Sequence, residues 1–263
     1  MKKAHMWAAK LVAIVMLVTA FAGISVFADT PVAAEGDLVQ AVAAATDGAE
    51  TVIQLGDNIT LTNTLSVPAG KNIVLDLNGH TLTVASDIDV IDNSGTLTVK
   101  NGTVAAPDKG SGTQGMAVDN LAGATLTVTQ DESFATKLIG RSGIQNAGTA
   151  VVENGTVESY NRNAIYTDTG SETVINGGTV TSPSGSSGMG RAISANGNVT
   201  ITGGTIYAGG TSGAGDAYGR RICKCNRHVR PGKTCDPSRR EFHGDRYVRN
   251  RLCRGKFQFR QYG

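Results

Sequence analysis

The middle of the chain repeats one short pattern, and this repeat constrains the fold more than any other feature of the sequence. Val and Ile alternate with Thr, and an Asn-Gly or Gly-Gly pair then precedes a second short apolar–polar stretch. The alternation is that of a β-strand with one buried face. Because Asn and Gly adopt positive φ at low cost, the pair predicts a tight corner. The copies occupy residues 90–104, 117–134, 143–157, 164–180 and 192–206.

The spacing of the copies predicts a parallel β-solenoid. Gly155 and Gly178 lie 23 residues apart, and Gly178 and Gly204 lie 26 apart. A fixed period of this length with short strands and no helical periodicity is typical of a solenoid, whereas a β-sandwich requires no period. Each turn would stack on the last at about 4.8 Å. We therefore expect Val and Ile to face inward, and Thr and Asn to form outer or corner columns.

Residues 1–28 read as a secretory signal peptide. Lys2, Lys3 and Lys10 precede an apolar run over residues 11–27, and Val26-Phe27-Ala28 forms a small–any–small cleavage site. A membrane anchor is the alternative, but the run of 17 residues is short for a transmembrane span. We expect cleavage after Ala28 and a protein that is secreted or held at the cell surface.

Residues 33–48 carry the only helical pattern outside the signal peptide. Leu38, Val39, Val42 and Ala43 would lie on one face, with Gly48 after the end. The first turn of a solenoid exposes an apolar end that needs a cap. The sequence therefore predicts a short N-terminal capping helix.

Residues 51–84 read as the first turns of the solenoid, with apolar and polar residues in alternation. The order of helix, strand, VPAGKNIVLDLNGHTLT (67–83) and glycine-marked turns resembles the pectate lyase-like superfamily of right-handed parallel β-helix proteins. The resemblance covers residues 36–210. It implies an all-β fold, a right-handed single-stranded parallel β-helix over residues 51–218. It implies less about activity, because such folds carry lyases, hydrolases, adhesins and inert surface proteins.

Residues 219–263 do not share the composition of the repeat. From Arg220 onward the chain has 14 basic residues against three acidic ones, a net charge of +11, whereas residues 29–219 carry −12. A zinc or nucleic-acid module would use the cysteines and histidines of this tail, but its Cys-x-Cys spacing is poor for zinc. A disulfide is the milder alternative in an exported protein. The tail's chemically relevant residues are Cys223, Cys225, His228, Cys235, His243 and Cys253.

The interpretation we favour for the tail is a frameshift product. A one-base shift of permitted codons turns DRYVRNRLCR (245–254) into TGTSGTGFAG, which has the Gly/Ser/Thr/Ala texture of residues 181–219. Arginine and cysteine are common products of glycine and alanine codons read out of frame. The tail is then expected to be non-native and disordered, and the true C-terminal turns to be lost.

The resemblance implies two kinds of chemistry. Lyases of the superfamily hold Ca²⁺ with acidic residues and abstract a proton with Arg or Lys on a neighbouring turn, and its hydrolases use clustered Asp pairs. Asp87, Asp89 and Asp92 are close in sequence. Asp87 and Asp89 would share an outward strand face, and we interpret them as solvated charges. No catalytic or metal-ligating residue is therefore predicted.

Three arginines, Arg141, Arg162 and Arg191, each precede a copy of the repeat. They would either stack as a basic column that binds an anionic polysaccharide or be ordinary exposed arginines. In the second case Asp168 or Glu172 would pair with Arg162.

The aromatic residues give only weak support for a sugar-binding platform. Tyr166 is the candidate ligand-binding aromatic, because it falls in the repeat column, although a buried or cross-strand role is the alternative. We expect Phe134 in the core and His80 as a turn residue.

A repetitive acidic solenoid without a convergent polar site favours a non-catalytic function. The sequence predicts a secreted or cell-surface β-helix, adhesin-like or structural, with polysaccharide or cell-envelope components as partners. It predicts no nucleic-acid partner and no cofactor. The alternative is a polysaccharide lyase or glycoside hydrolase whose active-site turns are missing or degenerate, and only this alternative would use Ca²⁺.

Overall fold

The computed structural model describes residues 31–108, 115–160, 162–182 and 191–208, together with the backbone of residues 218–219 and 222–224. The predicted signal peptide and all but a few residues of the basic tail lie outside the described residues. Among the described residues, no helix is both long and apolar enough to span a bilayer.

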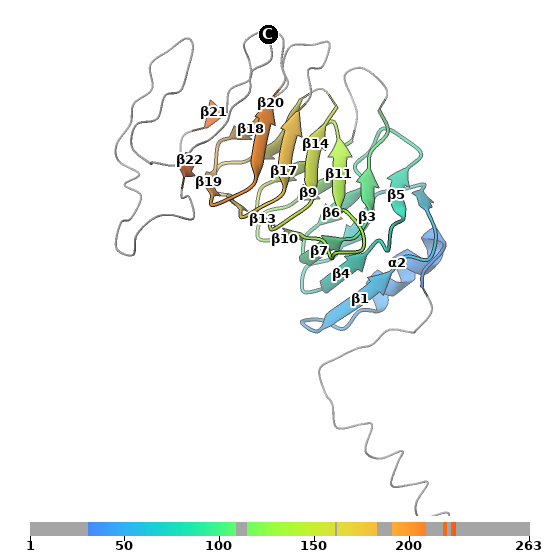
Figure 1. Cartoon of the computed structure of the whole chain (residues 1–263). Helices are drawn as coiled ribbons and strands as arrows, with labels where there is room; N and C mark the ends of the chain where they lie inside the picture. The colour runs from blue at the N-terminus through green and yellow to red at the C-terminus, as the bar shows by residue number, and fades with distance from the viewer. Residues whose placement is uncertain are drawn as a thin grey trace, which may run out of the picture.

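Three parallel β-sheets run the length of the molecule, and each turn of the chain contributes one strand to each sheet in order (Figure 1). The first sheet contains β1 (Glu50–Gln54), β4 (Asn72–Asp76), β7 (Thr96–Lys100), β10 (Thr125–Val128), β13 (Thr149–Val152), β16 (Glu172–Ile175), β19 (Asn198–Ile201) and β22 (Ile222–Lys224). The second contains β2 (Ile59–Leu61), β5 (Thr81–Val84), β8 (Thr103–Ala105), β11 (Lys137–Gly140), β14 (Thr156–Ser159), β17 (Thr179–Ser182) and β20 (Thr205–Ala208). The third contains β3 (Leu65–Val67), β6 (Ile91–Asn93), β9 (Val118–Asn120), β12 (Ile144–Asn146), β15 (Asn163–Thr167), β18 (Arg191–Ala195) and β21 (Tyr218–Gly219). The predicted all-β solenoid is therefore confirmed.

Apolar side chains of successive turns stack in columns along the interior. Most strands bury alternate residues, and the register of the strands stacks these residues into columns. Full burial of a Leu, Ile or Val stabilises the fold by about 1.5–3 kcal/mol, and each turn adds several such residues. One member of each column comes from each turn, as in Leu65, Ile91, Val118, Ile144, Ile165 and Ile193 of the third sheet.

The predicted corners carry the expected backbone geometry. Asn101 has φ of 63°, and Gly155, Gly178 and Gly204 have φ of 87°, 73° and 85°. Space is also short, because a Cβ at Gly178 would collide with the carbonyl oxygen of Gly155 in the turn below. The corner therefore demands Gly or Asn for its dihedral angles, and glycine where turns stack most closely.

A column of asparagines lies inside the solenoid, where the sequence predicted none. Asn93, Asn120 and Asn146 are fully buried at matching positions of β6, β9 and β12. The Asn93 amide donates to Asn120 Oδ1 at 2.7 Å, and the Asn120 amide donates to Asn146 Oδ1 at 2.8 Å. The prediction that Asn would lie only in outer or corner columns is wrong, because stacked amides satisfy one another without water.

The capping helix α2 (Glu35–Ala44) is shorter than the predicted 33–48 and contacts β1, β2 and β3. Leu38 and Val42 are buried, whereas Val39 is 48% exposed and Ala43 is exposed, so their predicted place on the buried face is wrong. The helix covers the end of the solenoid with a single i, i+4 stripe. The Glu35 carboxylate accepts hydrogen bonds from the Thr62 backbone N–H at 2.8 Å and the Thr62 hydroxyl at 2.9 Å, which anchors the helix start to the first turn.

Candidate functional site

The outer face of the third sheet carries a column of polar groups that could contact a ligand. Its short strands present one outward side chain each between two buried neighbours. Strand pairing places these side chains in one column, which we call the outer column: Asp92, Asp119, Gln145, Tyr166 and Ser194.

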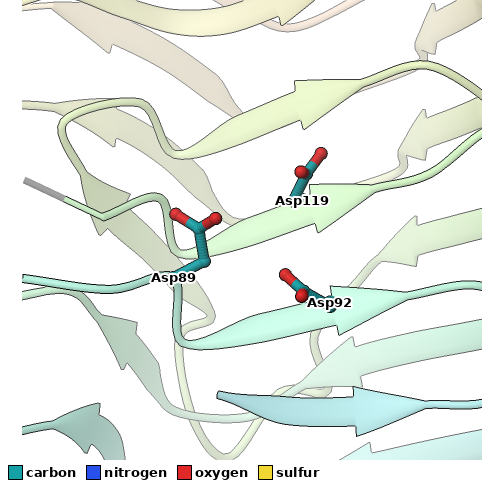
Figure 2. Close-up of side chains that lie close together, drawn as sticks. All are labelled: Asp89, Asp92 and Asp119. Carbon is teal, nitrogen blue, oxygen red and sulfur yellow. The ribbon is translucent and has the colours of Figure 1, made fainter. Parts of the chain in front are cut away.

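Three carboxylates meet at the N-terminal end of this column (Figure 2). Asp92 on β6 and Asp119 on β9 are direct partners in the parallel ladder, and Asp89 lies on the turn that leads into β6. One oxygen of each residue lies within 4.8 Å of the others. We call these residues the acidic cluster.

Burial and mutual repulsion both oppose ionisation of the acidic cluster. Desolvation, followed by the charges of Asp89, Asp92 and Asp168, raises the pKa of Asp119 to about 6. Desolvation and Asp89 also raise the pKa of Asp92, whose buried Oδ1 accepts no hydrogen bond from any described residue. Asp89 is better satisfied, because its Oδ1 accepts the Met116 backbone N–H at 2.6 Å.

The structure corrects the interpretation of Asp87 and Asp89 as neighbours on an outward strand face. Residues 85–88 form bends, so strand alternation does not apply, and Asp87 is exposed while Asp89 joins the acidic cluster. Sequence reasoning also missed Asp119. The matching tripeptides Ile91-Asp92-Asn93 and Val118-Asp119-Asn120 were the available signal, since equal positions in a repeat lie on top of one another.

The candidate arginines lie where the chain enters the third sheet. Arg141 and Arg162 occupy equivalent positions, three residues before the paired Ile144 and Ile165. Arg191 is offset by one residue, because it pairs with Asn163 on β15. Strict stacking of all three arginines is therefore not observed.

The charge environment of Arg141 shows which groups it faces. Desolvation and the neighbouring Arg162 lower the pKa of Arg141, and the nearby Asp89 carboxylate partly offsets them. Among the described residues, Arg162 forms no ion pair with Asp168 or Glu172.

Tyr166 lies in the repeat column as predicted, whereas Phe134 does not lie in the core. Tyr166 is half-buried in the outer column, and its hydroxyl accepts a hydrogen bond from the Asn196 amide at 2.8 Å. Phe134 is 44% exposed, so its predicted core position is wrong. It belongs to the chain between β10 and β11, and its ring covers Gly79, where a Cβ would lie 2.8 Å from the ring.

His80 lies at the corner that the sequence assigned to it. Its backbone N–H donates to the Leu77 carbonyl at 2.7 Å, and its carbonyl accepts the Thr103 N–H at 3.0 Å. The first bond closes the corner, and the second joins two successive turns through the main chain. The contacts of His80 are those of a turn residue.

The spacing of the acidic cluster suits a hard cation or a shared proton. One oxygen of each carboxylate lies within 4.8 Å of the other two, a span that a Ca²⁺ ion with bonds of about 2.3–2.6 Å can bridge. Carboxylates this close also favour a shared proton, in line with the raised pKa values of Asp92 and Asp119.

Comparisons with protein-family models, with curated proteins and with solved structures gave no match to this chain.

Proposed function

We propose that this chain is a secreted or cell-surface β-solenoid, adhesin-like or structural, that acts through non-catalytic contacts of its outer surface with polysaccharide or other envelope components. The observation that carries the proposal is the layout of the polar groups. They form a ladder along the outer face of the third sheet, with three carboxylates whose oxygens lie within 4.8 Å of one another at one end of it. A rigid ladder of this kind suits contact with an extended partner.

The test of the non-catalytic role uses the purified full chain and a panel of neutral and acidic polysaccharides. We expect retention of one or more of them on immobilised protein, and no new reducing ends or unsaturated products with or without Ca²⁺. Turnover that disappears in Asp119→Asn would contradict the proposal.

Export is the second part of the proposal and has its own test. The apolar run after Lys10 and the Val26-Phe27-Ala28 site support removal of residues 1–28. Expression of the full chain in a bacterial host should yield a mature protein outside the cytoplasm whose N-terminus is Asp29 by mass spectrometry. An unprocessed cytoplasmic protein would argue against it.

A Ca²⁺-dependent polysaccharide lyase is the competing function, and the acidic cluster is the specific observation that favours it. Asp89, Asp92 and Asp119 offer three oxygens within a span that a Ca²⁺ ion can bridge, and Arg141 is the adjacent basic group with a lowered pKa. When bound, the ion would neutralise the acidic group of the substrate. Release of unsaturated products only in the presence of Ca²⁺, and its loss in Arg141→Gln, would establish this function.

We also propose that the chain belongs to the pectate lyase-like superfamily and that residues from about 219 onward are a frameshift product. The solenoid with its N-terminal cap and the VPAGKNIVLDLNGHTLT segment support the first point, and the charge change at residue 220 supports the second. The nucleotide sequence around codon 219 tests the frameshift. An in-frame homologue that ends in the same Arg/Cys-rich tail would exclude it.

A further inference from the structure

We propose that Arg141 and Arg162 together bind one oxyanion, a carboxylate or sulfate, of an acidic sugar at the entrance to the third sheet. The inference goes beyond a general surface role, because it names the ligand chemistry and the two residues that recognise it. It depends neither on export nor on the absence of catalysis.

The two guanidinium groups come from equivalent positions of successive turns. Arg141 precedes β12 and Arg162 precedes β15. The pairing of Ile144 with Ile165 places the two arginines one above the other on successive turns. They lie close enough for Arg162 to lower the pKa of Arg141. Two adjacent like charges repel each other, so a shared anion stabilises both of them.

Neither guanidinium is neutralised within the described part of the chain. Arg141 is half-buried and Arg162 is exposed, and neither side chain forms a hydrogen bond or an ion pair with another described residue. A guanidinium carries five N–H donors in a planar fork that matches a carboxylate or a sulfate. The pair therefore offers unused donors that are directed by a fixed scaffold.

The main chain on which the arginines lie is held in place by close packing and hydrogen bonds. Gly140 and Gly143 flank Arg141, and a Cβ at either position would meet neighbouring atoms within 2.6–3.0 Å. The Arg141 N–H donates to the Gly115 carbonyl at 3.0 Å. The Arg162 carbonyl accepts the Ser182 hydroxyl at 2.8 Å and the Arg191 N–H at 2.9 Å. A ligand would therefore bind without the entropic cost of ordering the main chain at the two arginines.

The acidic cluster next to the arginines restricts which anions fit. Asp89, a member of the acidic cluster, is close enough to Arg141 to raise its pKa. A ligand with a second negative charge there would be repelled, whereas a hydroxyl group would donate to the carboxylate. A sugar that carries one acidic group beside free hydroxyls meets both requirements.

The experiment uses small ligands, because the 11 arginines of residues 220–263 would attract any long polyanion. The full chain, labelled with ¹⁵N-arginine, is titrated with a uronate trisaccharide, a sulfated trisaccharide and a neutral trisaccharide of equal size. Arg141→Lys and Arg162→Lys identify the two side-chain Nε–H signals. Isothermal calorimetry gives the affinities of the wild-type chain and of the double variant Arg141→Gln/Arg162→Gln.

We expect the Arg141 and Arg162 signals to move with one or both acidic trisaccharides, and not with the neutral one. Whichever acidic trisaccharide binds identifies the oxyanion. The double variant should lower the affinity at least about tenfold, because both charge-assisted contacts to the oxyanion are lost. Lys137→Gln is the matched control, because it removes one positive charge from the second sheet, where Lys137 pairs with Glu158 at 3.0 Å. It should leave the affinity unchanged.

Equal binding of the neutral sugar, shifts confined to other arginines, or unchanged affinity of the double variant would overturn the inference. If the double variant does not fold by circular dichroism, Arg162→Gln alone replaces it, because Arg162 is exposed. These results are separate from those of the turnover and export tests, so the inference can fail while the proposed function stands.

Discussion

At the scale of single residues, the protonation of Asp119 makes stability depend on pH. The pKa of Asp119, about 6 in the folded state, lies above its ordinary value of 3.8, so the folded chain binds more protons than the unfolded chain between these values. Stability is therefore greatest below about pH 4 with respect to this group, and it falls as the pH rises through 6. Partial exposure screens the effect, and we expect about 1 kcal/mol between pH 4 and pH 7.5.

Asp119→Asn should remove this dependence. Urea unfolding is expected to show the variant about 1 kcal/mol more stable than wild type at pH 7.5 and nearly equal to it at pH 4. Exposed Glu132→Gln serves as the control and should change neither value. A variant that is less stable than wild type at pH 7.5 would mean that the Asp119 carboxylate is held by a favourable partner, such as a bound cation.

Asn120 lies at the centre of the buried amide column, and its loss should be costly. Asn120→Ala removes the acceptor for Asn93 and the donor to Asn146, and it also breaks the 3.0 Å bond to the Thr149 carbonyl. Asn93 and Asn146 keep their bonds to the main chain, but each loses one buried partner, for which we expect a loss of about 2–4 kcal/mol in the free energy of unfolding. Chemical denaturation checks this, and a loss below about 1 kcal/mol would show that water enters the column.

At the scale of elements, the stacked corners depend on glycine for two separable reasons. Gly178 has positive φ and lies against the Gly155 carbonyl, whereas Gly170 has φ of 90° with no atom within 4 Å of a Cβ. Gly170→Ala should cost about 1 kcal/mol for its dihedral angles alone. Gly178→Ala should cost at least about 1 kcal/mol more because the turns must move apart. Equal losses in thermal or urea unfolding would show that the turns separate freely.

The strands and corners could be predicted from the sequence because each turn repeats the same local chemistry. Val199 and Ile201 alternate with threonines in the same way as their counterparts three turns below, Leu126 and Val128. Asn93 lies two residues after Ile91 on the same strand, so alternation would place both side chains inside. The polarity of Asn93 suggested an outer position instead. Polarity predicts exposure only when no neighbour completes the hydrogen bonds, and the neighbour here is another copy of the repeat.

The candidate site was harder to predict because it arises between turns and not within one. Arg141 and Arg162 are 21 residues apart, whereas Asp92 and Asp119 are 27 apart, since the loops between strands differ in length. The sequence identified the arginines but not their proximity to the acidic cluster. The predicted core position of Phe134 was wrong for a related reason. The chain between β10 and β11 departs from the repeat, so the position of Phe134 could not be inferred from the other copies.

At the scale of the whole molecule, the solenoid should behave as a one-dimensional stack whose ends open independently. The strand pairs that build the sheets join neighbouring turns, so the loss of the cap should expose the first turn without unfolding the later ones. Leu38 is fully buried against this end, and Leu38→Ala should raise amide hydrogen exchange in β1, β2 and β3 while protection in β13 and β16 is retained.

Val39→Ala provides the matched control for this prediction, because Val39 lies on the same helix and is 48% exposed. The substitution removes the two γ-methyl groups of Val39, but little of their surface packs against the solenoid. Amide exchange in the first turn should therefore stay near that of the wild-type chain. If Leu38→Ala instead raises exchange equally from β1 to β19, the columns couple all turns into a single cooperative unit. Stability would then belong to the solenoid as a whole and not to its individual interfaces.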